Sequence, residues 1–327
     1  MISALRRAGV EVEERHQPVW EGQEHKFAAG AGAAARLLAA EARLWRRPRG
    51  EWDAVVVGYP GHADVPAARR VGAPVVLNPL VSLWDTLVLD RARFSRSSPA
   101  ARALRAFDRF AFSRADVVVA DTAAHAELFR TLGASRVEVA LVGAEERLFT
   151  RGWSRPAQFV ALFVGKLIPL HGVETILAAA RAAPELRLRL VGSGQVAVRD
   201  VPPNVERVEW VPYEHLAVQY HRCGCALGVF GTSEKAARVI PNKVFQALAC
   251  GAPVVTADTP AARELLDDES ALLVPQGDPR ALAEAVRALA TNPSLQQSVA
   301  SSGHARYRER ASEDVLGARW REIVAHA

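Results

Sequence analysis

The chain of 327 residues is half hydrophobic and about a quarter charged, a composition that supports two packed cores and excludes a disordered chain, a collagen-like fibre and a disulfide scaffold. No apolar run approaches the roughly 18–20 residues of a membrane-spanning helix, and the amino terminus lacks the pattern of a secretory signal. The three cysteines predict reduced thiols in a cytoplasmic protein. Before residue 156 there are 23 Lys and Arg against 18 Asp and Glu, so the whole net charge of +5 lies there.

Short apolar runs alternate with longer helical patterns along the whole chain. Most of these runs are rich in Val and continuous, as expected when helices cover both faces of a parallel sheet. We predict strands at 54–58, 74–77, 116–120, 137–141, 159–164, 188–191, 205–209, 226–230, 253–256 and 271–274. We predict helices at 98–112, 173–183, 242–249, 280–290 and 313–324. This order predicts a doubly wound α/β protein.

The first residues do not start with a strand, although a parallel-sheet domain should. Residues 3–8 have a helical pattern, and 10–13 form the first short strand candidate. We therefore expect the leading strand of the amino-terminal domain to be missing.

A polar stretch with Gly and Pro, at 151–156, precedes a new strand and predicts the joint between two domains. We place these domains at 1–155 and 156–310. The remaining residues, 311–327, are expected to form a helix that packs back toward the first domain.

The turn after the strand at 159–164 carries charge where a ligand is expected. Gly165 ends the strand, Lys166 and His171 lie in the turn, and Gly172 leads into a helix. Ligands of open α/β sheets bind at the carboxyl ends of strands, where helix amino termini favour anions. The turn therefore suits a phosphate, although an ordinary turn with surface Lys and His would read the same.

Two further turns strengthen this interpretation. Gly192 and Gly194 follow the next strand and allow close approach of a ligand to the backbone. Later, Pro241 suits the first turn of a helix and Asn242 its cap. Lys243 would then oppose the helix dipole unless an anion lies there, which favours a ligand.

In combination, residues 159 to about 307 resemble the retaining nucleotide-sugar glycosyltransferases of family 4, which have the GT-B fold of two Rossmann-like domains facing a cleft. The family's strand-Gly-basic and Gly-x-Gly turns are matched here. Its A-C-G-x-P-V-V, Arg-Glu-Leu-Leu and P-x-G-D-P-x-x-L-A patterns are also present. The matching residues are Gly165, Lys166, His171–Gly172, Gly192–Gly194, Ala249–Val255, Arg263–Leu266 and Pro275–Ala283.

The resemblance implies a donor site in the second domain. The residues expected to bind the nucleotide sugar are Gly165, Lys166, His171, Gly192, Gly194, Val211, Glu234, Arg238, Asn242, Lys243 and Gln246. The chain departs from the family at two glutamates. Gln246 replaces the one that usually holds the ribose, and Arg238 replaces the other, so Glu234 is a candidate substitute.

The amino half is similar to the family's acceptor domain, less specifically. His62 and Asp85 follow two of its predicted strands. We expect them to face the cleft and act as catalytic residues on the transferred sugar or the acceptor. A loop-capping or solvated role remains the alternative for each.

The resemblance implies transfer with retention, by attack on the face from which the diphosphate leaves, so no double-displacement nucleophile is required. The sequence contains no Asp-x-Asp triplet. We therefore expect neither a metal nor another cofactor, and the nucleotide-sugar donor is a co-substrate. Lys166, His171, Lys243 and the helix amino terminus near Asn242 are expected to stabilise the leaving group.

The acceptor is expected to be a glycan, a lipid-linked glycan or a small molecule. Arg36, Arg43, Arg46, Arg47 and Arg49 form a basic amphipathic stretch with nearby leucines and a tryptophan. It predicts either peripheral contact with the inner membrane face or a solvated helix face. No recognised nucleic-acid motif accompanies this charge.

Two other classes of protein remain. A non-catalytic GT-B module would account for Arg238, Gln246 and the missing first strand. A nicotinamide-dependent oxidoreductase would need a Gly-rich turn after its first strand and an acidic residue about 20 positions later, and neither is visible.

Overall fold

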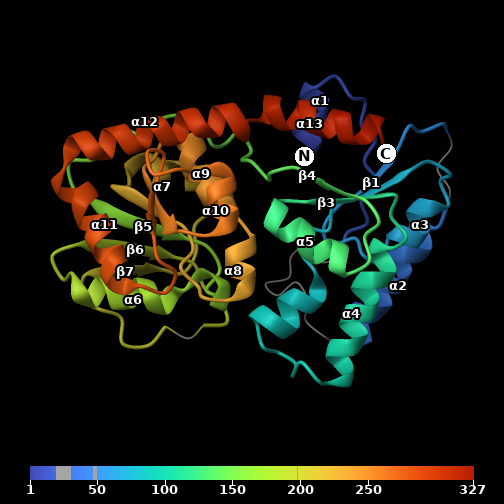
Figure 1. The fold of residues 1–327 in the computed structure, drawn as a ribbon, viewed down its shortest axis with the longest axis horizontal. Helices are drawn as coiled ribbons and strands as arrows, with labels where there is room; N and C mark the ends of the chain where they lie inside the picture. The colour runs from blue at the N-terminus through green and yellow to red at the C-terminus, as the bar shows by residue number, and fades with distance from the viewer. Residues whose placement is uncertain (20–30, 47–49, 197) are drawn as a thin grey trace.

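The computed structural model describes residues 1–19, 31–46, 50–196 and 198–327 and contains two parallel sheets flanked by helices (Figure 1). The smaller sheet has the order β1-β2-β3-β4, and the larger has the order β10-β9-β8-β5-β6-β7. The smaller sheet consists of β1 (Val55–Val57), β2 (Val75–Leu77), β3 (Val117–Ala120) and β4 (Val137–Val139). The larger consists of β5 (Val160–Val164), β6 (Arg187–Val191), β7 (Val205–Val208), β8 (Cys225–Leu227), β9 (Val254–Ala257) and β10 (Leu272–Val274). All ten predicted strands and the α/β class are confirmed.

The helices of the first half are α1 (Ile2–Arg7), α2 (Ala31–Leu44), α3 (Val65–Arg69), the π-helix η1 (Asp85–Asp90), α4 (Pro99–Phe112) and α5 (Ala123–Thr131). The second half contains η2 (Pro169–His171), α6 (Val173–Ala182), η3 (Tyr213–His215), α7 (Leu216–Arg222), α8 (Glu234–Arg238), α9 (Asn242–Cys250), α10 (Pro260–Leu265) and α11 (Pro279–Thr291). The chain continues through α12 (Pro293–Arg310) and α13 (Glu313–Ala325). The five predicted helices are confirmed as α4, α6, α9, α11 and α13.

Continuous apolar strands explain why both sheets are buried between helices. All three residues of β2 have no exposed surface, and helices cover both faces of the sheet. In the larger sheet, Phe163 of β5 and Phe245 of α9 are also fully buried, in two core clusters on opposite faces. Each half therefore has its own core, and each sheet can present its strand ends to a cleft.

The amino terminus partly contradicts the prediction. The helix expected at 3–8 is confirmed as α1, but the strand expected at 10–13 is wrong. The amide of Val10 donates to the Leu5 carbonyl at 3.1 Å, which turns the chain back onto α1. Among the described residues, β1 is the first strand.

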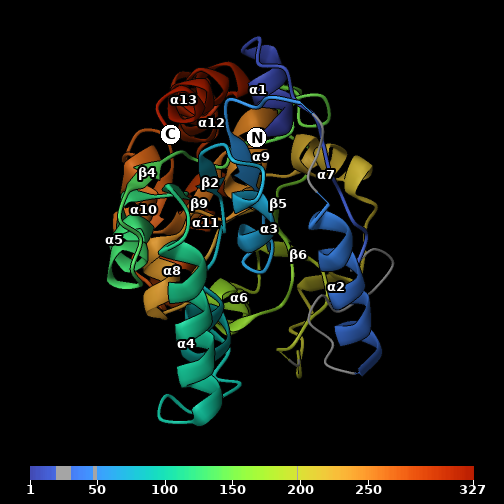
Figure 2. The same ribbon diagram turned by 90° about the vertical axis from the view of Figure 1, so that its right-hand side faces the viewer.

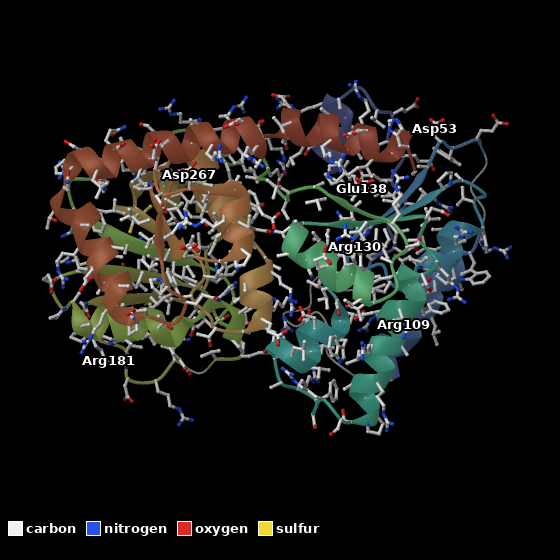
Figure 3. The ribbon with its side chains drawn as sticks, in the orientation of Figure 1. Asp53, Arg109, Arg130, Glu138, Arg181 and Asp267 are labelled. Atoms are coloured by element: carbon white, nitrogen blue, oxygen red, sulfur yellow. The ribbon has the colours of Figure 1, made fainter. Side chains whose placement is uncertain are left out.

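The last helix of the chain lies on the first half. Trp320 and Ile323 of α13 pack with Leu5 of α1 in one buried cluster, and Figure 1 shows α13 beside α1, beyond the end of α12. Glu138 of β4 lies below α13 (Figure 3), where Arg319 Nη2 donates to its carboxylate at 2.7 Å. The division at 1–155, 156–310 and 311–327 stays a prediction, since the sheets alone do not set its boundaries. No helix in the described ranges is long and apolar enough to cross a bilayer.

Candidate functional site

The turns after β5 and β6 pack directly against each other. The Gly165 amide donates to the Val191 carbonyl at 2.9 Å, and a Cβ at Gly192 would lie 2.0 Å from the Gly165 oxygen. A Cβ at Gly194 would lie 2.5 Å from the Leu167 oxygen. Gly192 and Gly194 are therefore needed for contact between the two turns. A side chain at either position is excluded by the backbone of the neighbouring turn. The expectation that these glycines make room for a ligand stays a prediction.

Lys243 lies beside this pair of turns, in the first turn of α9. Only 6% of the residue is exposed, and its Nζ lies 4.0 Å from the centre of the Phe163 ring. Within the described residues, this ammonium nitrogen has no hydrogen-bond partner. Burial lowers the pKa of Lys243 well below its usual value. Buried polar groups usually have a hydrogen-bond partner, and the amino end of a helix favours anions, so Lys243 is a candidate residue for binding an anion.

Glycine at position 165 makes room for this lysine. Gly165 has a φ of +147°, and a Cβ there would lie 2.9 Å from Lys243 Nζ and 3.3 Å from the His171 ring. Gly165, Lys243 and His171 therefore meet, as the sequence predicted.

His171 is buried next to Lys243 and is held by the turn. Its Nδ1–H donates to the Lys166 carbonyl, which leaves Nε2 as the atom that can gain a proton. Burial, followed by the nearby Lys243, lowers the pKa of His171 well below its usual value. The imidazole is therefore neutral without a ligand, and an anion would favour its protonation. The Lys166 side chain is exposed beside it.

The start of α9 differs from the prediction by one position. Pro241 has extended backbone angles and occupies the cap position, whereas Asn242 is the first helical residue and makes no capping bond. This geometry suits proline because its ring fixes φ at about −65°, close to the −74° found at Pro241. Asn242 is exposed, so its side chain is free to meet a ligand.

Two residues expected to contact the nucleoside, Gln246 and Val211, are held by protein groups. Gln246 is buried, and its Oε1 accepts a hydrogen bond from Tyr220 Oη at 3.1 Å. Val211 is half-buried and packs against the core of the second half. Both residues lie on the same half as Lys243, but protein groups already contact them.

Arg238 and Asp85 lie together, although they are 153 residues apart in sequence. Arg238 Nη1 donates to Asp85 Oδ1 at 2.9 Å, and Arg238 also pairs with Glu234. Asp85 has no exposed surface, and Lys235 Nζ lies 3.8 Å from its second carboxylate oxygen. Asp85 does lie where the halves meet, with Oδ1 bound by Arg238 and with Oδ2 lacking a hydrogen-bond partner among the described residues. Arg238 and Glu234 are likewise engaged with protein groups.

His62 does not face the cleft, so that expectation is wrong. The side chain has no exposed surface and lies between the Phe107 and Phe112 rings, with centroids 6.1 and 5.6 Å away. Its Nε2 lies 3.4 Å from Asp108 Oδ1. Burial lowers the pKa of His62. The strand-end position was predicted correctly, but the following turn directs the ring into the core of the first half.

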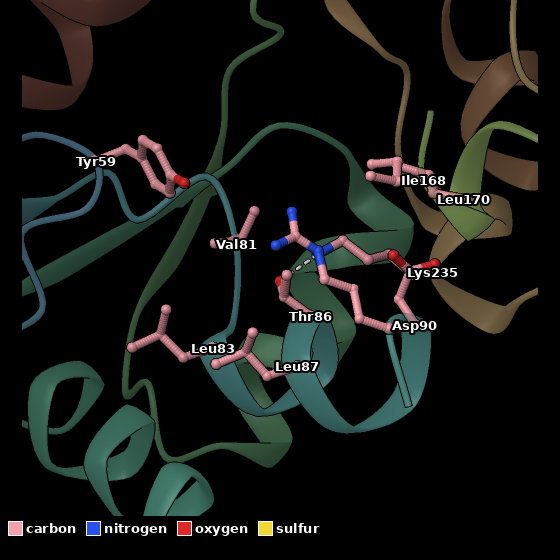
Figure 4. Close-up of a pocket in the computed structure, with 10 residues that line it drawn as sticks. Tyr59, Val81, Leu83, Thr86, Leu87, Asp90, Ile168, Leu170 and Lys235 are labelled. Carbon is pink, nitrogen blue, oxygen red and sulfur yellow. Dashed lines mark hydrogen bonds between the residues drawn. The ribbon is translucent and has the colours of Figure 1, made fainter. Parts of the chain in front are cut away.

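A cavity of about 120 Å³ lies between the two halves, beside the turn that follows β5 (Figure 4). Tyr59, Leu83 and Leu87 line it from the first half, and Ile168 and Leu170 line it from the second. Its polar wall consists of Thr86, Asp90, Arg91 and Lys235. Lys235 and Thr86 were missed by the sequence analysis, because nothing in their local sequence indicates a partner in the other half.

A larger cavity, of about 1130 Å³, is lined by residues of the amino terminus and of α2 and by residues that follow β1. Glu41 and Asp64 both line it, and burial together with a hydrogen bond to Asp64 raises the pKa of Glu41 to about 8. The three cysteines are free and buried. The described residues contain no group of three or more His, Cys, Asp or Glu that could hold a metal ion.

Two family models match the chain, one on each half. A glycosyl transferase 4-like domain matches residues 1–145, and a glycosyl transferase-like domain matches residues 166–323. Together with the two parallel-sheet domains, these matches define a GT-B glycosyltransferase. The chain belongs to the GT4-type glycosyltransferases.

Individual proteins agree with this class. A GDP-mannose-dependent α-(1-6)-phosphatidylinositol dimannoside mannosyltransferase of Mycobacterium tuberculosis is 25% identical over 224 residues, which are 62% of this chain and 57% of that enzyme. Among solved structures, Anabaena HepE in complex with UDP and glucose has a TM-score of 0.69 at 18% identity, covering 100% of this chain and 89% of HepE. Sucrose-phosphate synthase from Thermosynechococcus elongatus has a TM-score of 0.68 at 17% identity, covering 90% and 79% of the two chains. These two likenesses show the fold.

Proposed function

We propose that the chain transfers a hexose from a nucleoside diphosphate sugar to a hydroxyl group of an acceptor, with retention and without a metal ion. The observation that carries the proposal is Lys243, a buried amine at a helix amino terminus with no partner in the described part of the chain. The name of the mycobacterial relative states dependence on GDP-mannose, which supports a nucleotide sugar as donor.

The leaving diphosphate would be stabilised by groups of the second half. Lys243 and protonated His171 would each donate to its oxygens, and the exposed Lys166 would add a third positive charge. The free amides at the start of α9 would add their dipole. These groups are preorganised where negative charge develops, which is the arrangement that lowers the barrier of such a transfer.

The environments of Asp85 and His62, the two residues predicted to be catalytic, are consistent with retention by attack on the same face. Asp85 is bound by Arg238 and Lys235, and His62 is enclosed in the core. Neither side chain is free to act as a nucleophile in this arrangement, so the proposal needs no covalent intermediate. Asp85 and His62 are then not catalytic residues of this chain.

The test is a calorimetric binding screen with UDP-, GDP- and ADP-sugars on the full chain and on Lys243→Ala. We expect one donor class to bind, and binding to be lost or greatly weakened in the variant. The variant Arg207→Met is the matched control, because it removes an exposed cation from the same half. Absence of binding by all three classes would overturn the proposal.

Turnover tests the remaining parts of the proposal. The anomeric configuration of the product, measured by NMR, should equal that of the donor, and EDTA should not reduce the rate. A non-catalytic binding module is the second candidate, favoured by the engagement of Arg238 with Asp85 and by the Gln246 substitution. Donor binding without transfer or donor hydrolysis would select that candidate.

The acceptor proposal includes glycans, lipid-linked glycans and small molecules, with peripheral membrane contact through α2. On this helix and just beyond it, Leu38 is 71% exposed and Trp45 46% exposed, and Arg36, Arg43 and Arg46 are also exposed. Arg47 and Arg49 lie outside the described residues. Figure 1 shows α2 on the side of the molecule opposite the larger sheet, and in Figure 2 this helix lies at the edge of the view. Co-sedimentation with anionic but not with neutral vesicles is the expected result.

A further inference from the structure

Polar contacts between the two halves concentrate on α8 and η1. Ser233 Oγ donates to Asp90 Oδ1 at 3.1 Å, and Lys235 Nζ donates to Thr86 Oγ1. Arg238 donates to Asp85, as described above. Three polar contacts from residues 233–238 therefore join α8 and its cap residue in one half to the π-helix η1 of the other.

A second set of contacts lies beside the first. The carboxylate of Glu264, on α10, accepts from the backbone amides of Ala123 and Ala124 at 2.7 and 3.1 Å. These amides belong to the amino terminus of α5, where a negative charge is favourable. The Thr122 hydroxyl donates to the carbonyl of Arg238. Arg238 thus joins the first half through both its side chain and its backbone.

The buried contact of Asp85 with Lys235 and Arg238 forms only when the two halves are packed together. Asp85 has no exposed surface, the side chain of Lys235 is 5% exposed and that of Arg238 is 19% exposed. A buried carboxylate between two cations is tolerated only while all three are present, because removal of one partner leaves an uncompensated charge. The cavity beside the turn that follows β5 is lined by residues of both halves and exists only when they are in contact.

We propose that Arg238 and Asp85 are positioning residues that latch the two halves in the closed arrangement, so that a ligand of the cleft enters and leaves only when their pair separates. The effect of the latch on substrates rests on the proposed function. The latch itself does not rest on that function, because the pair is formed in the chain without a ligand.

The experiment measures hydrogen exchange of the full unliganded chain in peptides covering 85–91 and 233–238. The variants are Asp85→Asn, Arg238→Gln, the double variant and the conservative Arg238→Lys. Glu185→Gln is the control, because Glu185 pairs with Arg287 at 2.8 Å within one half. We expect exchange in both peptides to be about tenfold faster in the first two variants, with no further gain in the double variant, since both break the same pair. Arg238→Lys should restore most of the protection, and the control should match the parent chain.

The same variants are then tested with a fluorescent nucleoside diphosphate. Its association and its dissociation should both be about three- to tenfold faster in Asp85→Asn and Arg238→Gln, because entry and exit both require the pair to separate, and association is slow when binding needs a conformational change. Exchange equal to that of the control, in chains shown to be folded by circular dichroism, would overturn the latch. Faster exchange in a chain that binds no nucleotide would leave the latch standing and overturn the proposed function.

Discussion

Two buried lysines, only eight positions apart, show two different uses of a cation. Lys235 and Lys243 are 4% and 6% exposed, and burial lowers the pKa of both. Lys235 donates to Thr86 and lies near Asp85, and both partners come from the other half of the chain. Lys243 faces an aromatic ring and has no hydrogen-bond partner among the described residues.

Lys235 is paired across the two halves, whereas Lys243, under the proposed function, would be paired only by a bound ligand. A paired buried charge holds elements together, and its loss is felt as lost stability. An unpaired buried amine does not stabilise the unliganded chain, so under the proposed function Lys243 acts through the ligand that it binds. We call the contacts between α8 and η1 the seam, and the turns that contain Gly165 and Lys243 the donor turns. Mutations in the seam should therefore change stability and closure, and mutations in the donor turns should change ligand affinity.

The largest effect is expected at the seam. Asp85→Asn leaves Lys235 and Arg238 without their carboxylate, which should lower the free energy of unfolding by about 3 kcal/mol, as for other broken buried pairs. Urea denaturation followed by circular dichroism measures this change. The exposed pair of Glu185 and Arg287 gives the comparison, and Glu185→Gln should leave the unfolding free energy nearly unchanged. Equal losses in the two variants would remove the distinction between seam and surface.

The donor turns should show the opposite behaviour. Lys243→Met keeps most of the buried volume but removes the amine, so affinity for a nucleoside diphosphate should fall about 10- to 100-fold, the range for a lost charged hydrogen bond. The unliganded variant should be as stable as the parent chain or more stable. Isothermal titration measures the expected loss of affinity, and thermal unfolding measures the stability of the unliganded variant. A variant that binds normally but unfolds more easily would make Lys243 a structural residue like Lys235.

Acid pH should weaken the unliganded chain through its buried histidines. Burial lowers the pKa of His171 and of His62, so the unfolded chain takes up their protons first, near pH 6.5. Stability is therefore complete above that pH and lost as pH falls below it, by up to about 1.4 kcal/mol per pH unit for each histidine. Denaturation between pH 7.5 and 5 should show this slope, and His171→Gln should reduce it. A slope unchanged in His171→Gln would show that His171 is not neutral in the folded chain.

The smallest effect is expected at Gln246. Gln246→Glu keeps an acceptor for Tyr220 and restores the carboxylate that the family usually places near the ribose. A charged acceptor should increase nucleoside diphosphate affinity by about threefold. Competition against a fluorescent nucleotide measures this gain, with the free base as a control that lacks the ribose. Weaker binding of the nucleotide would place Gln246 outside the ribose site.

The sequence predicted the elements well because their signals are local. Continuous Val-rich runs identify buried parallel strands, the turn at Gly165 directly follows one of them, and Lys243 lies in the first turn of a helix that the sequence also predicts. Even the meeting of Gly165, His171 and Lys243 could be inferred, since the carboxyl ends of parallel strands lie along one edge.

The contacts between the halves could not be predicted in the same way. Nothing near Arg238 indicates that its partner is Asp85, because the pairing depends on how two separately folded sheets meet. His62 shows the converse error, since a strand end indicates where a residue lies but not which way its ring points. The strand expected at 10–13 failed because its backbone bonds back to α1 and, in the part of the chain that the structure describes, no strand pairs with it.

The proton balance of nucleotide binding tests the account most directly. Without a ligand, burial keeps the pKa of Lys243 and of His171 low, and a bound diphosphate would raise both. Titrations of a nucleoside diphosphate at one pH, in buffers of different ionisation enthalpy, should therefore show net proton uptake that is reduced in Lys243→Met, and affinity should fall as pH rises. Binding without proton uptake, or uptake that is unchanged in Lys243→Met, would contradict the assignment of Lys243 to the donor phosphates.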